Sequence, residues 1–141
     1  MPKKKDKKDK KIKLGVASNY PVGDFLIRVK NASLAHKKEI TVRRTKLVEA
    51  VAEALVKEGY LNQVKKEGEM LLMTLSYRKK EPEIFGLKLV SKPGLRVYLG
   101  IEDLEKRRKP SILLISTPKG IISGREALKA RVGGEVIVEV W

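Results

Sequence analysis

Ser91-Lys92-Pro93-Gly94-Leu95-Arg96-Val97-Tyr98 contains the first of four turns in the last third of the chain, and these turns decide the fold. The other three lie in Ile115–Gly120, Ser123–Glu126 and Val132–Val136. Short runs of β-branched residues separate them, which is typical of short strands. Glycine or proline marks each turn, and Ser, Thr, Lys and Arg gather in this region. Small hydroxyls and cations on tight loops favour contacts to a polyanion whose backbone comes close.

Upstream of these turns, helical periodicity predicts two amphipathic helices. Apolar residues recur at helical spacing after Pro21 and again from Leu47 to Val56, and Gly59 suits a left-handed C-cap. Strands are expected at 39–42, 61–64 and 70–77, then at 84–90, 95–99, 111–115 and 135–141. Short helices are expected at 101–108 and from Ser123, whose spacing to Glu126 fits a capping box, to about residue 131.

This order of elements predicts an α+β fold in two small halves. N-terminal helices would cover a short sheet, and a C-terminal, mostly β domain would carry one short helix. A cluster of charges at Arg78–Glu81, followed by Pro82, predicts the boundary. The expected divisions are a disordered Lys-rich tail (1–14), an N-terminal α+β domain (15–81) and a C-terminal domain (82–141).

Composition points to an anionic partner. The 141 residues carry a net charge of +15 and a sequence pI of about 10.0. Nucleic acid is the first candidate and an anionic membrane surface the second. No window approaches the roughly 18 apolar residues of a membrane span, and the Lys-rich tail has no apolar anchor beside it.

The chain offers little material for catalysis or metal binding. It has no cysteine and one histidine, His36, so thiolate zinc sites, cysteine nucleophiles and disulfides are excluded. We find no nucleophile–base pair and no ligand cluster. No enzyme activity, cofactor, metal or small-molecule substrate is therefore expected.

The stretch Ser116-Thr117-Pro118-Lys119-Gly120 is the strongest local candidate for an RNA contact. The hydroxyls of Ser116 and Thr117 could bond base edges and ribose 2′-OH groups. Lys119 would supply a charge to a phosphate, and Gly120 would let the backbone approach. An ordinary polar hairpin explains the same five residues and, on this segment alone, is the simpler interpretation.

Four further residues could flank that loop: Arg96, Tyr98, Lys92 and Arg125. In an alternating strand Arg96 and Tyr98 would share a face, where they could stack on a splayed base. Tyr98 could equally pack at the edge of the core. Aromatic residues make up only 5% of the chain, so recognition by shape, sugar and phosphate is favoured over a broad stacking platform.

Charged residues elsewhere are further candidates for contacts to RNA. Glu135 could accept a hydrogen bond from a base amine or a 2′-OH, or form a salt bridge to Arg125 or Arg131. Arg28 and Lys30, beside the apolar stripe of the first helix, could contact phosphates. Residues 1–13 hold eight lysines and two aspartates, and serve either as a solubilising tail or as an arm along phosphates.

Taken together, the motifs resemble those of bacterial-type small-subunit ribosomal protein eight. The resemblance covers about residues 20–141 and is looser in the first half, at Asp24–Ala32 and Lys57–Leu61. Its most specific parts are Ser-x-Pro-Gly-x-Arg-x-Tyr from Ser91, Ser-Thr-x-x-Gly from Ser116, Arg-Glu-Ala from Arg125 and Val-Gly-Gly-Glu from Val132.

The resemblance implies a two-domain structural protein of the cytoplasmic ribosome, without turnover. It implies direct, early binding to the central domain of small-subunit ribosomal RNA, with neighbouring small-subunit ribosomal proteins as further partners. The C-terminal domain would bind RNA, with Ser116, Thr117, Tyr98 and Glu135 meeting an irregular RNA helix. The alternative is another basic nucleic-acid-binding protein outside the ribosome.

Two positions depart from the family pattern. Pro118 stands where the family usually has serine, so a contact through a hydroxyl or a backbone N–H is lost there. Gly124 stands where the family commonly has an acid.

Overall fold

A computed structural model describes residues 20–141. The predictions for the Lys-rich tail, including residues 1–13, fall outside the described residues. The first half of the described chain forms a layer that we call the N-terminal layer. Its elements are α2 (Pro21–Leu34), β1 (Glu39–Arg43), α3 (Lys46–Lys57), β2 (Leu61–Glu67) and β3 (Met70–Leu75).

The N-terminal layer consists of two helices packed on an antiparallel sheet with strand order β1-β3-β2. Pro21 begins α2, where its missing N–H costs no helical hydrogen bond. Thr45 caps α3 by accepting a hydrogen bond from the Val48 N–H at 3.1 Å. Gly59 ends the second helical segment with φ of +89°, as expected from the sequence.

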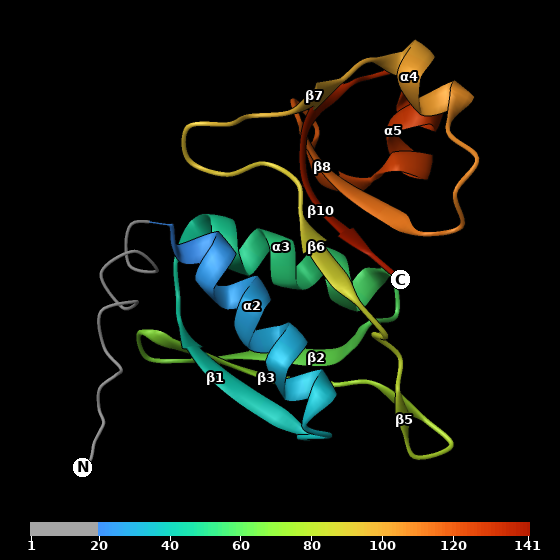
Figure 1. Cartoon of the computed structure of the whole chain (residues 1–141). Coiled ribbons are helices and arrows are strands. Elements are labelled where there is room, and N and C mark those ends of the chain that lie inside the picture. Colours follow the sequence, from blue (N-terminus) through green and yellow to red (C-terminus); the bar gives the residue numbers. More distant parts are fainter. Residues whose placement is uncertain (1–19) are drawn as a thin grey trace.

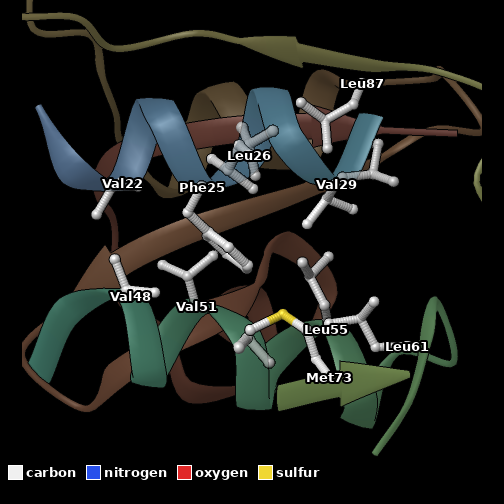
Figure 2. Packing of buried hydrophobic residues seen from close by; sticks show 14 of the residues in the cluster. Val22, Phe25, Leu26, Val29, Val48, Val51, Leu55, Leu61, Met73 and Leu87 are labelled. Carbon is white, nitrogen blue, oxygen red and sulfur yellow. The ribbon is translucent and has the colours of Figure 1, made fainter. Parts of the chain in front are cut away.

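Phe25 lies at the centre of the main apolar core. Figure 2 shows its ring pointing from α2 toward α3, where Val51 lies. Alternate residues of β3, including Met73, are buried against the helices. Full burial of such side chains stabilises the fold by about 1.5–3 kcal/mol each. The completely buried large residues of this core are Phe25, Leu26, Leu55, Leu61, Leu71, Met73 and Leu114.

The second half forms a five-stranded sheet that we call the C-terminal sheet. Its strand order is β6-β10-β8-β9, and the short β7 also pairs with β10. Helices α4 and α5 lie together on one side of it (Figure 1). The elements are β6 (Leu87–Leu89), β7 (Tyr98–Leu99), α4 (Ile101–Lys106), β8 (Ile112–Thr117), β9 (Gly120–Ser123), α5 (Gly124–Ala130) and β10 (Gly134–Val140).

Both faces of the C-terminal sheet are covered, which explains the wholly apolar run in β8. Leu113 and Ile115 join a small cluster with α4 and α5, whereas Leu114 joins the main core. Successive side chains of a strand point to opposite faces, so Leu113 and Ile115 meet one covering layer and Leu114 meets the other. Helices and sheets in this arrangement confirm the expected α+β class. The division of the chain at residue 82 stays a prediction.

Several elements are shorter than the sequence predicts. The strand expected at 84–90 is only Leu87–Leu89, because the N–H groups of Phe85 and Gly86 bond the carbonyl of Trp141 instead. The strand expected at 95–99 is only Tyr98–Leu99, because the chain before it turns back on itself at Lys92 and Leu95. The charged cluster at 78–81 forms a small hairpin, with β4 (Tyr77–Arg78) paired to β5 (Glu81–Pro82). Within residues 20–141, no helix is long and apolar enough to cross a membrane.

Candidate nucleic-acid interface

Tyr98, Glu135 and Ser116 form a row across three strands, which we call the cross-strand row. Glu135 of β10 lies opposite Tyr98 of β7 on one side and opposite Ser116 of β8 on the other. Directly opposed residues of antiparallel strands project from the same face. Tyr98 is 67% exposed, so its ring does not pack at the core edge. Three segments that are far apart in sequence therefore bring an aromatic ring, a carboxylate and a hydroxyl together.

Two glycines allow β10 to take this position. A side chain on Gly134 would begin 2.0 Å from the carbonyl oxygen of Ser116. One on Gly133 would begin 2.4 Å from the carbonyl oxygen of Leu99. Both obstacles are backbone atoms that cannot swing aside. The Gly-Gly pair thus lets β10 start between β7 and β8, and it fixes the register of Glu135.

The turn that follows Ser116 is held by the hydroxyl of Thr117. This hydroxyl accepts a hydrogen bond from the Lys119 N–H at 3.0 Å and donates one to the Gly120 carbonyl at 2.9 Å. Gly120 has φ of +111°, which favours glycine. Lys119 and Gly120 are exposed at the tip, beside the end of the cross-strand row. Thr117 therefore shapes the turn, and within residues 20–141 the Ser116 hydroxyl has no hydrogen-bond partner.

A second compact loop precedes Tyr98. Lys92 and Leu95 exchange two backbone hydrogen bonds of 2.8 and 2.9 Å around Pro93-Gly94, and Gly94 has φ of +85°. This confirms the turn that the Pro-Gly pair predicts. The fully buried Ser91 accepts a hydrogen bond from the Val97 N–H at 2.9 Å and so closes the base of the loop. Lys92 is exposed on the turn.

Arg96 lies in this loop and not in a strand, because the strand expected from residue 95 begins only at Tyr98. The shared face of Arg96 and Tyr98 stays a prediction. Its Nη1 is 3.1 Å from Oε2 of Glu135. Its guanidinium also lies over the ring of Tyr20, 5.8 Å from the ring centre. Glu135 thus pairs with Arg96, whereas Arg131 lies 3.7 Å from Glu105.

Tyr20 is the contributor that the sequence did not reveal. Its hydroxyl donates to the carbonyl of Ser91 at 3.1 Å, across a separation of 71 residues. Burial raises the pKa of Tyr20, and the nearby Arg96 charge opposes that rise. No local pattern links residue 20 to residue 96, so spacing in the sequence could not predict this contact.

Three predicted site residues lie away from the cross-strand row. Arg125 is exposed on α5 and lines a cavity with Ser111 and Ile112, at the opposite end of β8 from Ser116. Arg28 and Lys30 belong to α2, about two to three helical turns beyond Tyr20. Among residues 20–141, no group of three or more His, Cys, Asp or Glu side chains is placed to hold a metal ion.

Comparison with known proteins identifies the family to which the chain belongs. The sequence model of the family described as ribosomal protein S8 matches residues 20–141. The chain is 43% identical over 122 residues to small ribosomal subunit protein uS8 of Nitratidesulfovibrio vulgaris strain DP4, covering 86% of this chain and 97% of that protein. It is 41% identical over 132 residues to the uS8 protein of Persephonella marina, with the same coverage. It is 42% identical over 127 residues to that of Caldanaerobacter subterraneus, covering 86% and 96%. The chain therefore belongs to the ribosomal protein S8 family, whose members are structural ribosomal proteins and not enzymes.

Proposed function

We propose that this protein is a structural constituent of the small ribosomal subunit in the cytoplasm that binds the central domain of small-subunit ribosomal RNA directly and helps its assembly. The observation that carries the proposal is the cross-strand row of Tyr98, Glu135 and Ser116. The relatives of this chain are named as proteins of the small ribosomal subunit. Neighbouring ribosomal proteins of that subunit are the other expected partners.

Each member of the row has chemistry suited to an irregular RNA helix. The exposed ring of Tyr98 offers a face on which an unstacked base can stack. The Glu135 carboxylate can accept a hydrogen bond from a base amine or a 2′-OH. The Ser116 hydroxyl can both donate and accept. Because all three stand on paired strands, their spacing is fixed before RNA arrives.

Cations near the row would bind the RNA backbone. Lys119 stands on the turn after Ser116, and Lys92 on the Pro-Gly turn before Tyr98. We propose that they hold phosphates and leave base discrimination to the row. Thr117 would contribute by keeping the turn in shape. Arg28, Lys30 and Arg125 would contact RNA only at places away from the cross-strand row.

Replacing the row residues tests the site. We expect Ser116→Ala and Tyr98→Ala each to weaken binding to a central-domain transcript by about 1–3 kcal/mol, the range for one good base or stacking contact. Filter binding or fluorescence anisotropy at fixed salt would measure the loss. Phe85→Ala is the matched control, because this ring is 72% exposed but lies outside the row. If both row variants bind like the parent, the site is wrong.

Deleting residues 1–13 tests the role of the lysine-rich segment. We expect weaker binding to every RNA and a shallower dependence on salt, because fewer counterions are released. Selectivity for the central domain should change little. Association with the ribosome is tested separately on a density gradient of cell lysate. There the protein should co-migrate with small subunits in moderate salt, and migration with nucleoid or membrane would contradict the proposal.

A further inference from the structure

We propose that Arg96 and Tyr20 are positioning residues for RNA binding. On this inference Arg96 acts through Glu135 and does not itself hold a phosphate. The inference rests on the proposed function, because it concerns how the cross-strand row is kept ready for RNA.

A continuous chain of contacts connects the start of α2 to the row. The Tyr20 hydroxyl bonds the Ser91 carbonyl at 3.1 Å, and the Arg96 guanidinium covers the Tyr20 ring. The same guanidinium reaches Glu135 at 3.1 Å. Figure 1 shows the long loop between β6 and β7 reaching out above the start of α2. Arg96 is therefore held between an aromatic face and a carboxylate.

The Tyr20 ring is itself fixed in place. A side chain on Gly23 would begin 2.5 Å from Cδ2 of Tyr20, so the ring lies directly on the first turn of α2. The Tyr20 hydroxyl donates its hydrogen bond to the backbone carbonyl of Ser91, the buried residue that closes the loop. A planar guanidinium stacks on such a face and keeps its N–H groups directed, which a lysine ammonium does not do.

Glu135 needs this support because a carboxylate is repelled by RNA phosphates. The Arg96 charge offsets that repulsion locally and fixes the orientation of the carboxylate. Arg96 binds Oε2. Within residues 20–141, Oε1 forms no hydrogen bond, so it remains the oxygen that can accept from RNA. Arg96 would thus prepare the acceptor without touching RNA.

A double-mutant cycle tests whether Arg96 acts through Glu135. The variants are Arg96→Gln, Glu135→Ala and the pair, each measured with a bacterial central-domain rRNA transcript and with a scrambled RNA duplex of equal length. We expect Arg96→Gln to weaken binding to the transcript about three- to tenfold, with no change on the duplex. When Arg96→Gln is added to Glu135→Ala, it should cause no further loss of binding, and the salt dependence of binding should stay unchanged.

A phosphate ligand would behave differently. Arg96→Gln would then weaken binding to both RNAs, with or without Glu135, and would lower the slope of log K against log salt by about 0.7–0.9. That result would overturn the inference. Arg96→Lys separates charge from geometry: it should lose most of what Arg96→Gln loses, and parent-like binding would also overturn the inference.

Tyr20 provides a test without any change of charge. Tyr20→Phe keeps the ring face and should bind the transcript nearly as well as the parent. Tyr20→Leu removes the ring face and should weaken binding to the transcript about as much as Arg96→Gln does. In a protein that already carries Arg96→Gln, Tyr20→Leu should cause no further loss. Thermal unfolding would verify that each variant is folded. If Tyr20→Leu does not fold, the binding of Arg96→Lys decides whether the inference holds. That variant alters only the Arg96 side chain, which is 48% exposed.

The failure of this inference can be told apart from the failure of the proposed site. If Glu135→Ala and Tyr98→Ala bind the transcript like the parent, the row is not the RNA site. If those two variants lose about fivefold or more while the Arg96 and Tyr20 variants do not, only the positioning role is wrong.

Discussion

The N-terminal layer and the C-terminal sheet are stabilised in different ways. Around Phe25, stability comes from apolar side chains packed between two helices and a sheet (Figure 2). On one face of the C-terminal sheet, a separate cluster of five buried residues joins the sheet to α4 and α5. The opposite face of the sheet is covered by the main core. Its shape depends on glycines, tight turns and polar contacts. The candidate RNA surface therefore lies where backbone register, and not apolar volume, decides which side chains meet.

The largest effect should follow from emptying the main core. Phe25 is 1% exposed, and Phe25→Ala should lower the free energy of unfolding by about 3–5 kcal/mol through lost burial and the remaining cavity. Denaturant unfolding would measure it. Phe85→Ala, at an exposed ring, should change it by less than about 0.5 kcal/mol. A small loss at Phe25 would break the contrast between the two regions.

A smaller loss of stability, accompanied by weaker RNA binding, is expected when a glycine of the Gly133-Gly134 pair is replaced. Gly134→Ala places a methyl group against the Ser116 carbonyl and should cost about 1–3 kcal/mol. It should also weaken binding to the central-domain transcript, because it displaces Glu135 from Ser116. Gly100→Ser is the control, since a side chain there meets nothing within 4 Å. If Gly134→Ala binds RNA and unfolds like the parent, the register of β10 does not determine the positions of the side chains in the cross-strand row.

The smallest effect concerns a polar contact within the C-terminal sheet. Ser111 donates to Glu139 at 2.5 Å, and Arg107 lies 3.2 Å from the same carboxylate. The Ser111 bond is the main cause that lowers the pKa of Glu139. We expect Ser111→Ala to cost about 1 kcal/mol at neutral pH.

The pH dependence of that effect has a definite sign. A carboxylate whose pKa is lower in the folded state stabilises the fold above its unfolded pKa, near 4.5. This stability is lost as pH falls through the folded value. The difference between parent and Ser111→Ala should therefore shrink below pH 4.5, as unfolding at a series of pH values would show. A difference that grows in acid would contradict the assigned contact.

Local spacing was enough to predict most elements. The stripe after Pro21, the cap position Gly59 and the Pro93-Gly94 turn each depend on residues only a few positions apart. The apolar run of β8 was predicted as buried for the same reason. The lengths of β6 and β7 were not predictable, because the partners that compete for their backbone groups are distant, as Trp141 is for Phe85.

The sequence by itself determined the class of elements, the basic character of the chain and the motifs around Ser116 and Glu135. These depend on composition and on short-range periodicity, which the chain carries in any conformation. Only the tertiary structure decided that Glu135 stands between Tyr98 and Ser116, and that Arg96 joins it to Tyr20. Strand register and contacts across 71 residues arise from how the whole chain packs, so no local rule could specify them.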